Sequence, residues 1–287
     1  CPFRTLTRAA PQSIVTSMAT KSHRHAAVAI LLASCLLAHA HDTHPDRLNY
    51  KSPDEPIVIG EGKFKYQLVP GWSQHNTAKY KIGNGKAIVE DAKGRIYHLN
   101  GSAKNCVIVL NRKGDVLKAW GDFAPGAHGL NILKEGNREV LFISENRANG
   151  KIFKTTLDGE ILLTVSCPTE SGLYPDPGKF RPAEVVLLPN GDFFALDGYG
   201  SDYILRFNKA GKYLSAFGGN LGEGEAQLKH WGPHGANIDY RDPKNPVLII
   251  GLSDQEKIKR FKLDGTHIDT IPMPGANPRD IYFHRGH

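Results

Sequence analysis

The chain is poor in sulfur-containing residues and has no apolar run long enough for a membrane-spanning helix. Its 287 residues include only four cysteines and two methionines. Two of these cysteines, Cys106 and Cys167, lie outside the first 40 residues, which excludes a dense disulfide scaffold or a cysteine-rich zinc module. The most apolar stretch, residues 26–38, spans 13 residues, whereas a transmembrane helix needs about 20. We therefore expect no stable membrane span.

Acidic residues are absent from the first 40 residues, and this segment carries much of the positive charge. The formal net charge is +7, but Arg4, Arg8, Lys21 and Arg24 lie in that acid-free segment. Without these four, 32 of the 36 basic residues remain against 29 acidic ones. A nearly neutral chain attracts nucleic acid weakly, so we expect no nucleic-acid partner.

The same segment has the three zones of a secretory signal. Met18 precedes Lys21 and Arg24, the apolar stretch follows, and Ala38-His39-Ala40 has the small residues of a cleavage site. We therefore predict that residues 1–40 are upstream residues and a signal peptide. The folded protein would then be secreted or periplasmic. The residues around Cys35 also resemble a lipobox, so a lipoprotein anchored through Cys35 is the alternative.

Four copies of one strand pattern follow, and a fifth begins at Pro278. The copies begin at Gly85, Ala127, Pro182 and Pro233. Each contains short runs rich in β-branched and aromatic residues, and each has a turn dipeptide at the same point: Lys113-Gly114, Asp158-Gly159, Ala210-Gly211 and Asp264-Gly265. Repeats of about 40–55 residues with short strands are typical of β-propeller blades. A two-sheet sandwich also has evenly spaced strands, but it does not need repeated units.

The predicted fold is therefore an all-β propeller, with four whole blades and a fragment in this sequence. Residues 41–65 are polar and contain proline, which predicts a linker. We predict that residues 66–287 form a propeller of about six blades that continues past His287. A strand near Tyr66 would complete the last blade and leave no free sheet edge. We expect a monomer that binds a small molecule or a peptide.

The repeats align a set of polar residues at one rim of the central channel. The first strand of each blade lines the channel, and its start carries, in order, Lys86, His128, Ala183, His234 and Arg279. The turn between the second and third strands reaches the same rim with Ser102, Arg147, Tyr199 and Asp254. His128 and His234 occupy one repeat position two blades apart, each before a glycine. Because zinc is commonly bound by neutral imidazole, we predict that these two histidines are metal ligands.

Tyr199 is the predicted general base. A phenol has an ordinary pKa near 10, and a nearby zinc ion or guanidinium lowers that pKa toward the range in which a base works. The alternative for Tyr199 is a turn tyrosine that packs against the next blade. Arg147, Arg181, Lys86 and Arg279 are the cations predicted to orient a substrate at this rim. Insertions at 168–180 and 220–231 are predicted to form a lid through Tyr174 and Trp231, with ordinary surface loops as the alternative.

Three of these segments resemble a known enzyme family. Ala127-His128-Gly129-Leu130, Asp197-Gly198-Tyr199-Gly200 and Pro233-His234-Gly235 are similar, in this order, to segments of the peptidyl-α-hydroxyglycine α-amidating lyases, which are NHL-repeat six-bladed propellers. The resemblance covers residues 66–287. It implies an NHL-type propeller in which His128 and His234 bind zinc and Tyr199 is the base. It also implies a structural calcium ion at the backbone carbonyl of Leu130.

The chain departs from this family at three positions. The third zinc histidine would lie beyond His287 unless Arg279 replaces it, and the family's two substrate-orienting arginines fall at Ser253 and near Leu99. The resemblance implies a secreted zinc-dependent lyase that cleaves a C–N bond of an α-hydroxyglycine-type amide or a related small substrate. The alternative is a non-catalytic NHL-repeat propeller that binds a peptide or glycan. A calcium-dependent lactonase is disfavoured because none of the five rim positions is acidic.

Overall fold

The computed structural model describes residues 57–74, 79–80, 82–229 and 232–283, which belong to two compact units with their boundary in the chain after Pro70. In the first unit, β1 (Val58–Ile59) pairs with β2 (Tyr66–Gln67), and the 3₁₀ helix η2 (Gly62–Phe64) lies between them. The strand predicted near Tyr66 therefore pairs with a strand from the predicted linker. The predicted leader lies outside the described residues.

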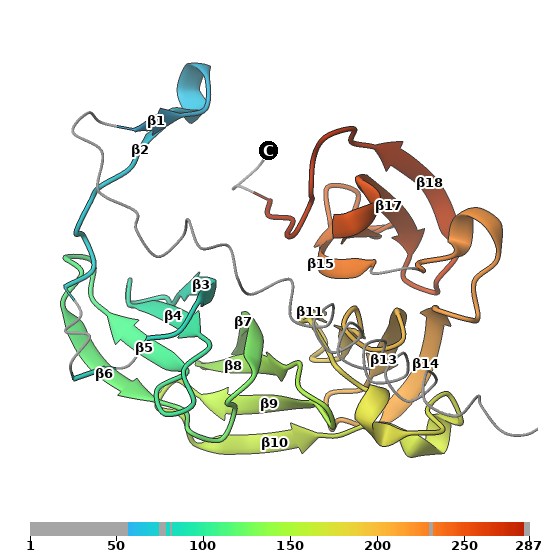
Figure 1. The fold of residues 1–287 in the computed structure, drawn as a ribbon, viewed down its shortest axis with the longest axis horizontal. Coiled ribbons are helices and arrows are strands. Elements are labelled where there is room, and N and C mark those ends of the chain that lie inside the picture. The colour runs from blue at the N-terminus through green and yellow to red at the C-terminus, as the bar shows by residue number, and fades with distance from the viewer. Residues whose placement is uncertain (1–56, 75–78, 81, 230–231, 284–287) are drawn as a thin grey trace, which may run out of the picture. The chain divides into compact units, whose positions relative to one another are not determined.

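The second unit contains four sheets of four antiparallel strands each, which confirms the predicted blades (Figure 1). The strands of the first two blades are β3 (Gly85–Glu90), β4 (Ile96–Asn100), β5 (Val107–Leu110), β6 (Val116–Trp120), β7 (Ala127–Glu135), β8 (Arg138–Glu145), β9 (Lys151–Thr156) and β10 (Ile161–Val165). The strands of the other two are β11 (Glu184–Leu187), β12 (Phe193–Leu196), β13 (Tyr203–Phe207), β14 (Tyr213–Gly218), β15 (Pro233–Asp239), β16 (Val247–Leu252), β17 (Lys257–Lys262) and β18 (His267–Pro272). Within each sheet, each strand pairs with the next one along the chain, as a propeller blade requires.

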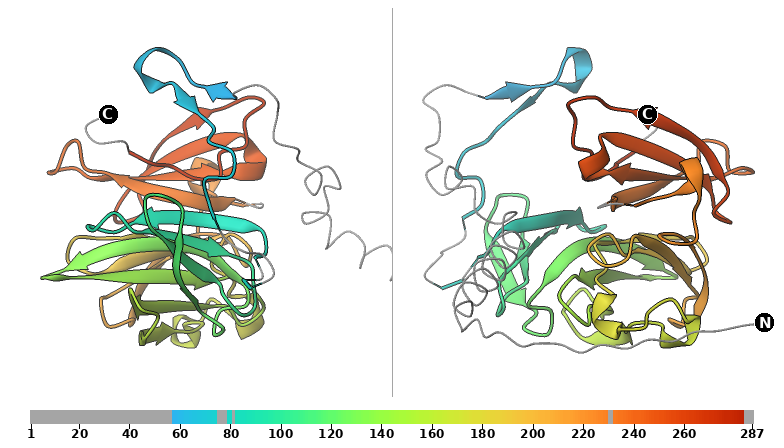
Figure 2. Two further views of the ribbon diagram at one scale, coloured as in Figure 1. Left: turned by 90° about the vertical axis from the view of Figure 1, so that its left-hand side faces the viewer. Right: turned by 45° about the vertical axis from the view of Figure 1, so that its right-hand side comes forward.

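The first strands of successive blades are neighbours. β3 contacts β7, β7 contacts β11, and β11 contacts β15, whereas the fourth strands lie at the far edges of their sheets. Figure 2 shows this succession of blades from two further directions. The starts of β7, β11 and β15 are therefore brought to one place. A total of about six blades in the whole protein stays a prediction.

The repeated turn between the third and fourth strands depends on glycine. Gly114, Gly159, Gly211 and Gly265 have φ angles of 88°, 91°, 78° and 91°, in the left-handed region that glycine adopts without strain. Each of them ends the turn dipeptide predicted from the sequence. These four turns are thus equivalent in structure as well as in sequence.

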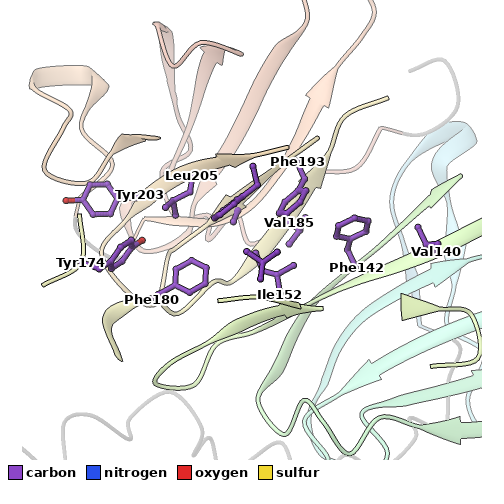
Figure 3. Close-up of a cluster of buried hydrophobic side chains, with 12 residues drawn as sticks. Val140, Phe142, Ile152, Tyr174, Phe180, Val185, Phe193, Tyr203 and Leu205 are labelled. Carbon is purple, nitrogen blue, oxygen red and sulfur yellow. The ribbon is translucent and has the colours of Figure 1, made fainter. Parts of the chain in front are cut away.

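Hydrophobic side chains fill the spaces between adjacent blades. Between the second and third blades, Phe142 packs against Phe193 with ring centroids 5.3 Å apart, and Val185 and Ile152 lie in the same cluster (Figure 3). Phe193 is completely buried. Burial of one such side chain stabilises a fold by about 1.5–3 kcal/mol, so these clusters hold the blades together.

The two insertions pack onto the blades. The first contains η3 (Thr169–Ser171) and η4 (Pro177–Lys179), and its Tyr174 is 5% exposed within the hydrophobic cluster (Figure 3). The lid predicted for this side chain is therefore wrong, because the ring is part of the core. The second insertion contains η5 (Gly224–Ala226) and is held by the buried Lys259, whose Nζ donates to the carbonyls of Glu225 and Gln227. Trp231 lies outside the described residues. No helix in the described part of the chain is long and apolar enough to cross a membrane.

Candidate metal and catalytic site

His128 and His234 are each the second residue of an innermost strand, β7 and β15 respectively. The residue that follows each histidine must be glycine, because the backbone of the next blade leaves no space for a side chain there. A Cβ at Gly129 would lie 2.7 Å from the carbonyl oxygen of Ala183, and one at Gly235 would overlap the carbonyl oxygen of Arg279. Contacts this short do not occur in real structures, so only glycine fits at both places. The repeated His-Gly pair thus reflects close packing between blades.

Both imidazoles are fixed by the backbone of the following blade. His128 Nδ1 lies 3.0 Å from the carbonyl oxygen of Ala183, and His234 Nδ1 lies 2.9 Å from that of Arg279. A carbonyl oxygen only accepts hydrogen bonds, so Nδ1 carries the hydrogen in both rings. Each Nε2 atom therefore carries a free lone pair.

An asparagine three residues after each histidine strengthens the same connection. Asn131 Nδ2 donates to the carbonyl of Val185 at 2.7 Å, and Asn237 Nδ2 donates to that of Ile281 at 3.0 Å. A His-Gly-x-Asn segment thus ties each of these blades to the segment after it. Residues 279–281 consequently take the place of a first strand beside β15, where the sequence predicted a fifth repeat.

Tyr199 completes the cluster from the turn that follows β12. Its hydroxyl oxygen lies 3.0 Å from His128 Nε2 and 3.1 Å from His234 Nε2. The phenol has one hydrogen and can donate it to only one of the two nitrogens. Two imidazole lone pairs and a phenol oxygen therefore meet at one point, where the phenol hydrogen can satisfy only one of the two lone pairs.

Burial keeps both imidazoles neutral. Burial, together with the cost of a second positive charge beside His234 and the charges of Lys86 and Arg279, lowers the pKa of His128 to about 3, although the hydrogen bond to Ala183 opposes this. Burial also lowers the pKa of His234. Protonation of Nε2 is thus disfavoured in both histidines. Neutral imidazole is the form that binds metals.

This arrangement fits a divalent metal of the zinc type. Histidines that bind metals almost always donate their other ring N–H to a carbonyl or carboxylate, as both do here. A catalytic zinc commonly takes three protein ligands and keeps one position open. Within the described residues, no group of three or more His, Cys, Asp or Glu side chains would hold a metal ion. The described residues bring two imidazoles and one phenol together at this point.

The structure places the four predicted cations in two groups. Lys86 and Arg279 act electrostatically on His128. Arg147 follows β8, and its charge offsets part of the rise that burial causes in the pKa of Glu145. Arg181 donates Nε–H to the carbonyl of Asn146 at 2.9 Å. Among the described residues, none of these four cations makes an ion pair. Lys86 and Arg279 are thus the two with charges close to the histidines.

Two carboxylates near this rim were missed in the sequence. Glu184 and Asp280 each directly follow a rim position, where the histidine repeats have glycine. Burial, with a smaller contribution from the charge of Asp280, raises the pKa of Glu184 to about 8. Burial also raises the pKa of Asp280. Leu130, the residue matched to a calcium ligand, is buried in β7 two residues after His128. The sequence signal that could have identified these two carboxylates is an acidic residue at the repeat position where the histidine repeats have glycine.

A cavity of about 350 Å³ lies beside Lys86. Its lining also includes Ile88, His98, Asp280 and Tyr282. This volume suits a small ligand, and the lining combines apolar side chains with charges of both signs.

Comparison with known proteins gives one curated relative. The chain is 31% identical over 121 residues to peptidyl-alpha-hydroxyglycine alpha-amidating lyase 2 of Drosophila melanogaster. The match covers 39% of this chain and 27% of that protein, so the chain matches little more than a quarter of the relative's length. The resemblance to this lyase inferred from the sequence is thus supported. No protein-family profile matches the chain.

Solved structures share the fold at low sequence identity. A streptogramin B lyase structure has a TM-score of 0.50 and 16% identity, with 67% of this chain and 56% of that chain covered. Virginiamycin B lyase from Staphylococcus aureus has a TM-score of 0.49 and 16% identity, with 78% and 65% covered. The first of these likenesses supports the propeller fold.

Proposed function

We propose that this chain belongs to a zinc-dependent, lyase-like propeller that cleaves a C–N bond of an α-hydroxyglycine-type amide or a related small substrate. The observation that carries the proposal is the convergence of His128 Nε2 and His234 Nε2 on the hydroxyl of Tyr199, at 3.0 and 3.1 Å. The curated lyase relative supports the reaction class.

His128 and His234 hold the zinc ion in this proposal. A zinc ion held by these two residues would supply a Lewis acid for an oxygen of the substrate. The carbonyls of Ala183 and Arg279 fix the two rings through Nδ1, which leaves both Nε2 lone pairs available to a metal. The neutral imidazoles need lose no proton on binding it.

Tyr199 is the proposed base. It takes the proton of the substrate's α-hydroxyl group, whose oxygen then forms a carbonyl with the α-carbon. The C–N bond breaks at the same carbon, its electron pair goes to the amide nitrogen, and that nitrogen takes up a proton. The products are an amide and an aldehyde, glyoxylate in the case of an α-hydroxyglycine. The step needs neither an oxidant nor a reductant.

Lys86 and Arg279 are proposed to orient an anionic group of the substrate, and Arg147 and Arg181 to contribute positive charge from the neighbouring turns. The absence of ion pairs to these four cations among the described residues supports this role. The 350 Å³ cavity beside Lys86 is the proposed place for the rest of the substrate.

A structural calcium ion at the Leu130 carbonyl is a second proposal. Calcium takes oxygen ligands, and the carboxylates of Glu184 and Asp280 are close enough for the charge of Asp280 to raise the pKa of Glu184. The raised pKa values favour the neutral carboxyl groups of Glu184 and Asp280. A bound cation would reverse these shifts and favour the charged carboxylates. We further propose that the protein is a monomer, secreted or periplasmic, or else a lipoprotein anchored through Cys35.

The test is an assay of the zinc-loaded chain with an α-hydroxyglycine peptide and a panel of other hydroxylated small amides. Aldehyde release that depends on zinc and is lost in a His128→Ala, His234→Ala double variant supports the proposal. Zinc binding without turnover of any of these amides contradicts it and favours a non-catalytic propeller that binds a peptide or glycan.

A further inference from the structure

The turn that carries Tyr199 is closed by its own backbone. The amide of Asp197 donates to the carbonyl of Tyr203 at 2.9 Å, and the amides of Gly200 and Asp202 both donate to the carbonyl of Asp197 at 3.0 Å. Tyr199 lies inside this loop, so its place depends on what holds Asp197.

The carboxylate of Asp197 is completely buried and accepts three hydrogen bonds. Its Oδ1 accepts from the amide of Arg181 at 2.6 Å, and its Oδ2 accepts from the hydroxyl of Tyr174 at 2.7 Å and the amide of Ser201 at 2.8 Å. Tyr174 belongs to the first insertion, and Arg181 directly follows it. The carboxylate therefore joins the insertion to the turn of Tyr199.

The turn also has no space in which to shift. A Cβ at Gly198 would overlap the carbonyl oxygen of Pro233, and one at Gly200 would overlap that of Lys179. Pro233 directly precedes His234, and Lys179 lies in η4 of the insertion. The turn is thus confined between the insertion on one side and the start of β15 on the other.

The ring of Tyr174 is itself held firmly. It lies 5.8 Å from the Phe180 ring and 5.7 Å from the Tyr203 ring, and its side chain is 5% exposed (Figure 3). Hydrogen bonds in such a buried network reinforce one another, so its hydroxyl is a rigid donor to Asp197.

We propose that Asp197, held by the Tyr174 hydroxyl, is a positioning residue that fixes the Tyr199 phenol between the two histidines. The first insertion would then hold the turn of Tyr199 in place through the Tyr174 hydroxyl. The effect on turnover rests on the proposed function of Tyr199, whereas the effect on the place of the phenol does not.

The experiment compares Tyr174→Phe, Asp197→Asn and the control Tyr213→Phe in the full chain. Tyr213 packs against the same hydrophobic cluster, and no hydrogen bond of its hydroxyl is found among the described residues. Tyr174→Phe keeps the ring and removes one donor. Asp197→Asn keeps the shape but places an amide N–H against a backbone N–H. 3-Fluorotyrosine introduced at position 199 reports the environment of that phenol by ¹⁹F NMR.

We expect both test variants to shift the ¹⁹F resonance of residue 199 and the midpoint of its titration, while Tyr213→Phe changes neither. With an active substrate, kcat should fall about tenfold or more in Asp197→Asn, since small misplacements of reacting groups cost up to about 10²-fold, and KM should change less than about threefold. If Asp197→Asn does not fold, Tyr174→Phe decides the result.

A ¹⁹F resonance and titration midpoint at residue 199 that match the wild type in folded Tyr174→Phe and Asp197→Asn would overturn the proposal. A wild-type protein without turnover would contradict the proposed function alone, because the ¹⁹F result does not depend on activity.

Discussion

The imidazole ring of His128 lies edge-on to that of His234, with ring centroids 5.0 Å apart and an interplanar angle of 71°. Each ring is fixed by a carbonyl of the next blade through Nδ1. The two Nε2 atoms are therefore oriented by the fold itself. A site prepared in this way loses little side-chain freedom when it binds a ligand, which favours affinity.

Replacing either histidine should remove most of the bound zinc. His128→Ala and His234→Ala each delete one ligand and leave the hydroxyl of Tyr199 beside the other, so we expect a large loss of zinc per chain by elemental analysis. His267→Ala is the matched control because His267 lies in β18, at the outer edge of its sheet. Full zinc stoichiometry in the double variant would contradict the proposed metal site.

Tyr199→Phe should abolish turnover while the protein stays folded. Phenylalanine keeps the ring and removes only the hydroxyl, and loss of a general base typically lowers the rate by about 10²- to 10⁴-fold. Zinc content and Tm should stay close to those of the wild type. A rate within about threefold of the wild type would show that the hydroxyl is not the base.

Alanine at either rim glycine should destabilise the fold. Gly129→Ala places a Cβ 2.7 Å from the carbonyl oxygen of Ala183, and Gly235→Ala makes an even closer contact with Arg279. We expect the free energy of unfolding to fall by about 1–3 kcal/mol in urea titrations, as is typical of overpacked sites. In the control Gly101→Ala, the nearest atom to the new Cβ is 3.9 Å away, so little change is expected. Equal stability of all three variants would exclude the packing argument.

Asp197 should give the fold a pH dependence of known sign. Burial raises its pKa from 3.8 to about 7, although three hydrogen bonds oppose that rise. Between these two values the folded protein keeps a proton that the unfolded chain releases. The contribution of Asp197 to the free energy of unfolding therefore falls as pH rises, by up to about 1.4 kcal/mol per pH unit.

Asp197→Asn removes this titration. Urea unfolding of wild type and variant at several values between about pH 4 and pH 7 measures the difference. The wild type should lose stability relative to the variant as pH rises. Parallel stability curves would show that the carboxyl group has an ordinary pKa in the folded protein.

The sequence predicted those parts of the site that recur with the repeat. His128 and His234 stand at one repeat position, so the period alone placed them together, and the hairpin glycines followed from the same pattern. Tyr174 was misjudged as part of a lid because it lies in an insertion, where no repeat fixes the geometry. Tyr174 is buried and bonded to Asp197, and the backbone amide of Arg181 bonds to the same carboxylate. Such partners depend on how a loop folds back, which periodicity does not encode.

The His-Gly-x-Asn segments couple the distance between adjacent blades to the positions of the two imidazole rings. His128 reaches the next blade through one nitrogen and faces the hydroxyl of Tyr199 through the other, across one rigid ring. A small opening between two blades, from heat, denaturant or a mutation far out on a sheet, would thus turn that ring and change the distance between the two Nε2 atoms. The site should therefore release its ligand before the sheets themselves unfold. Zinc release would then report the first separation of neighbouring blades.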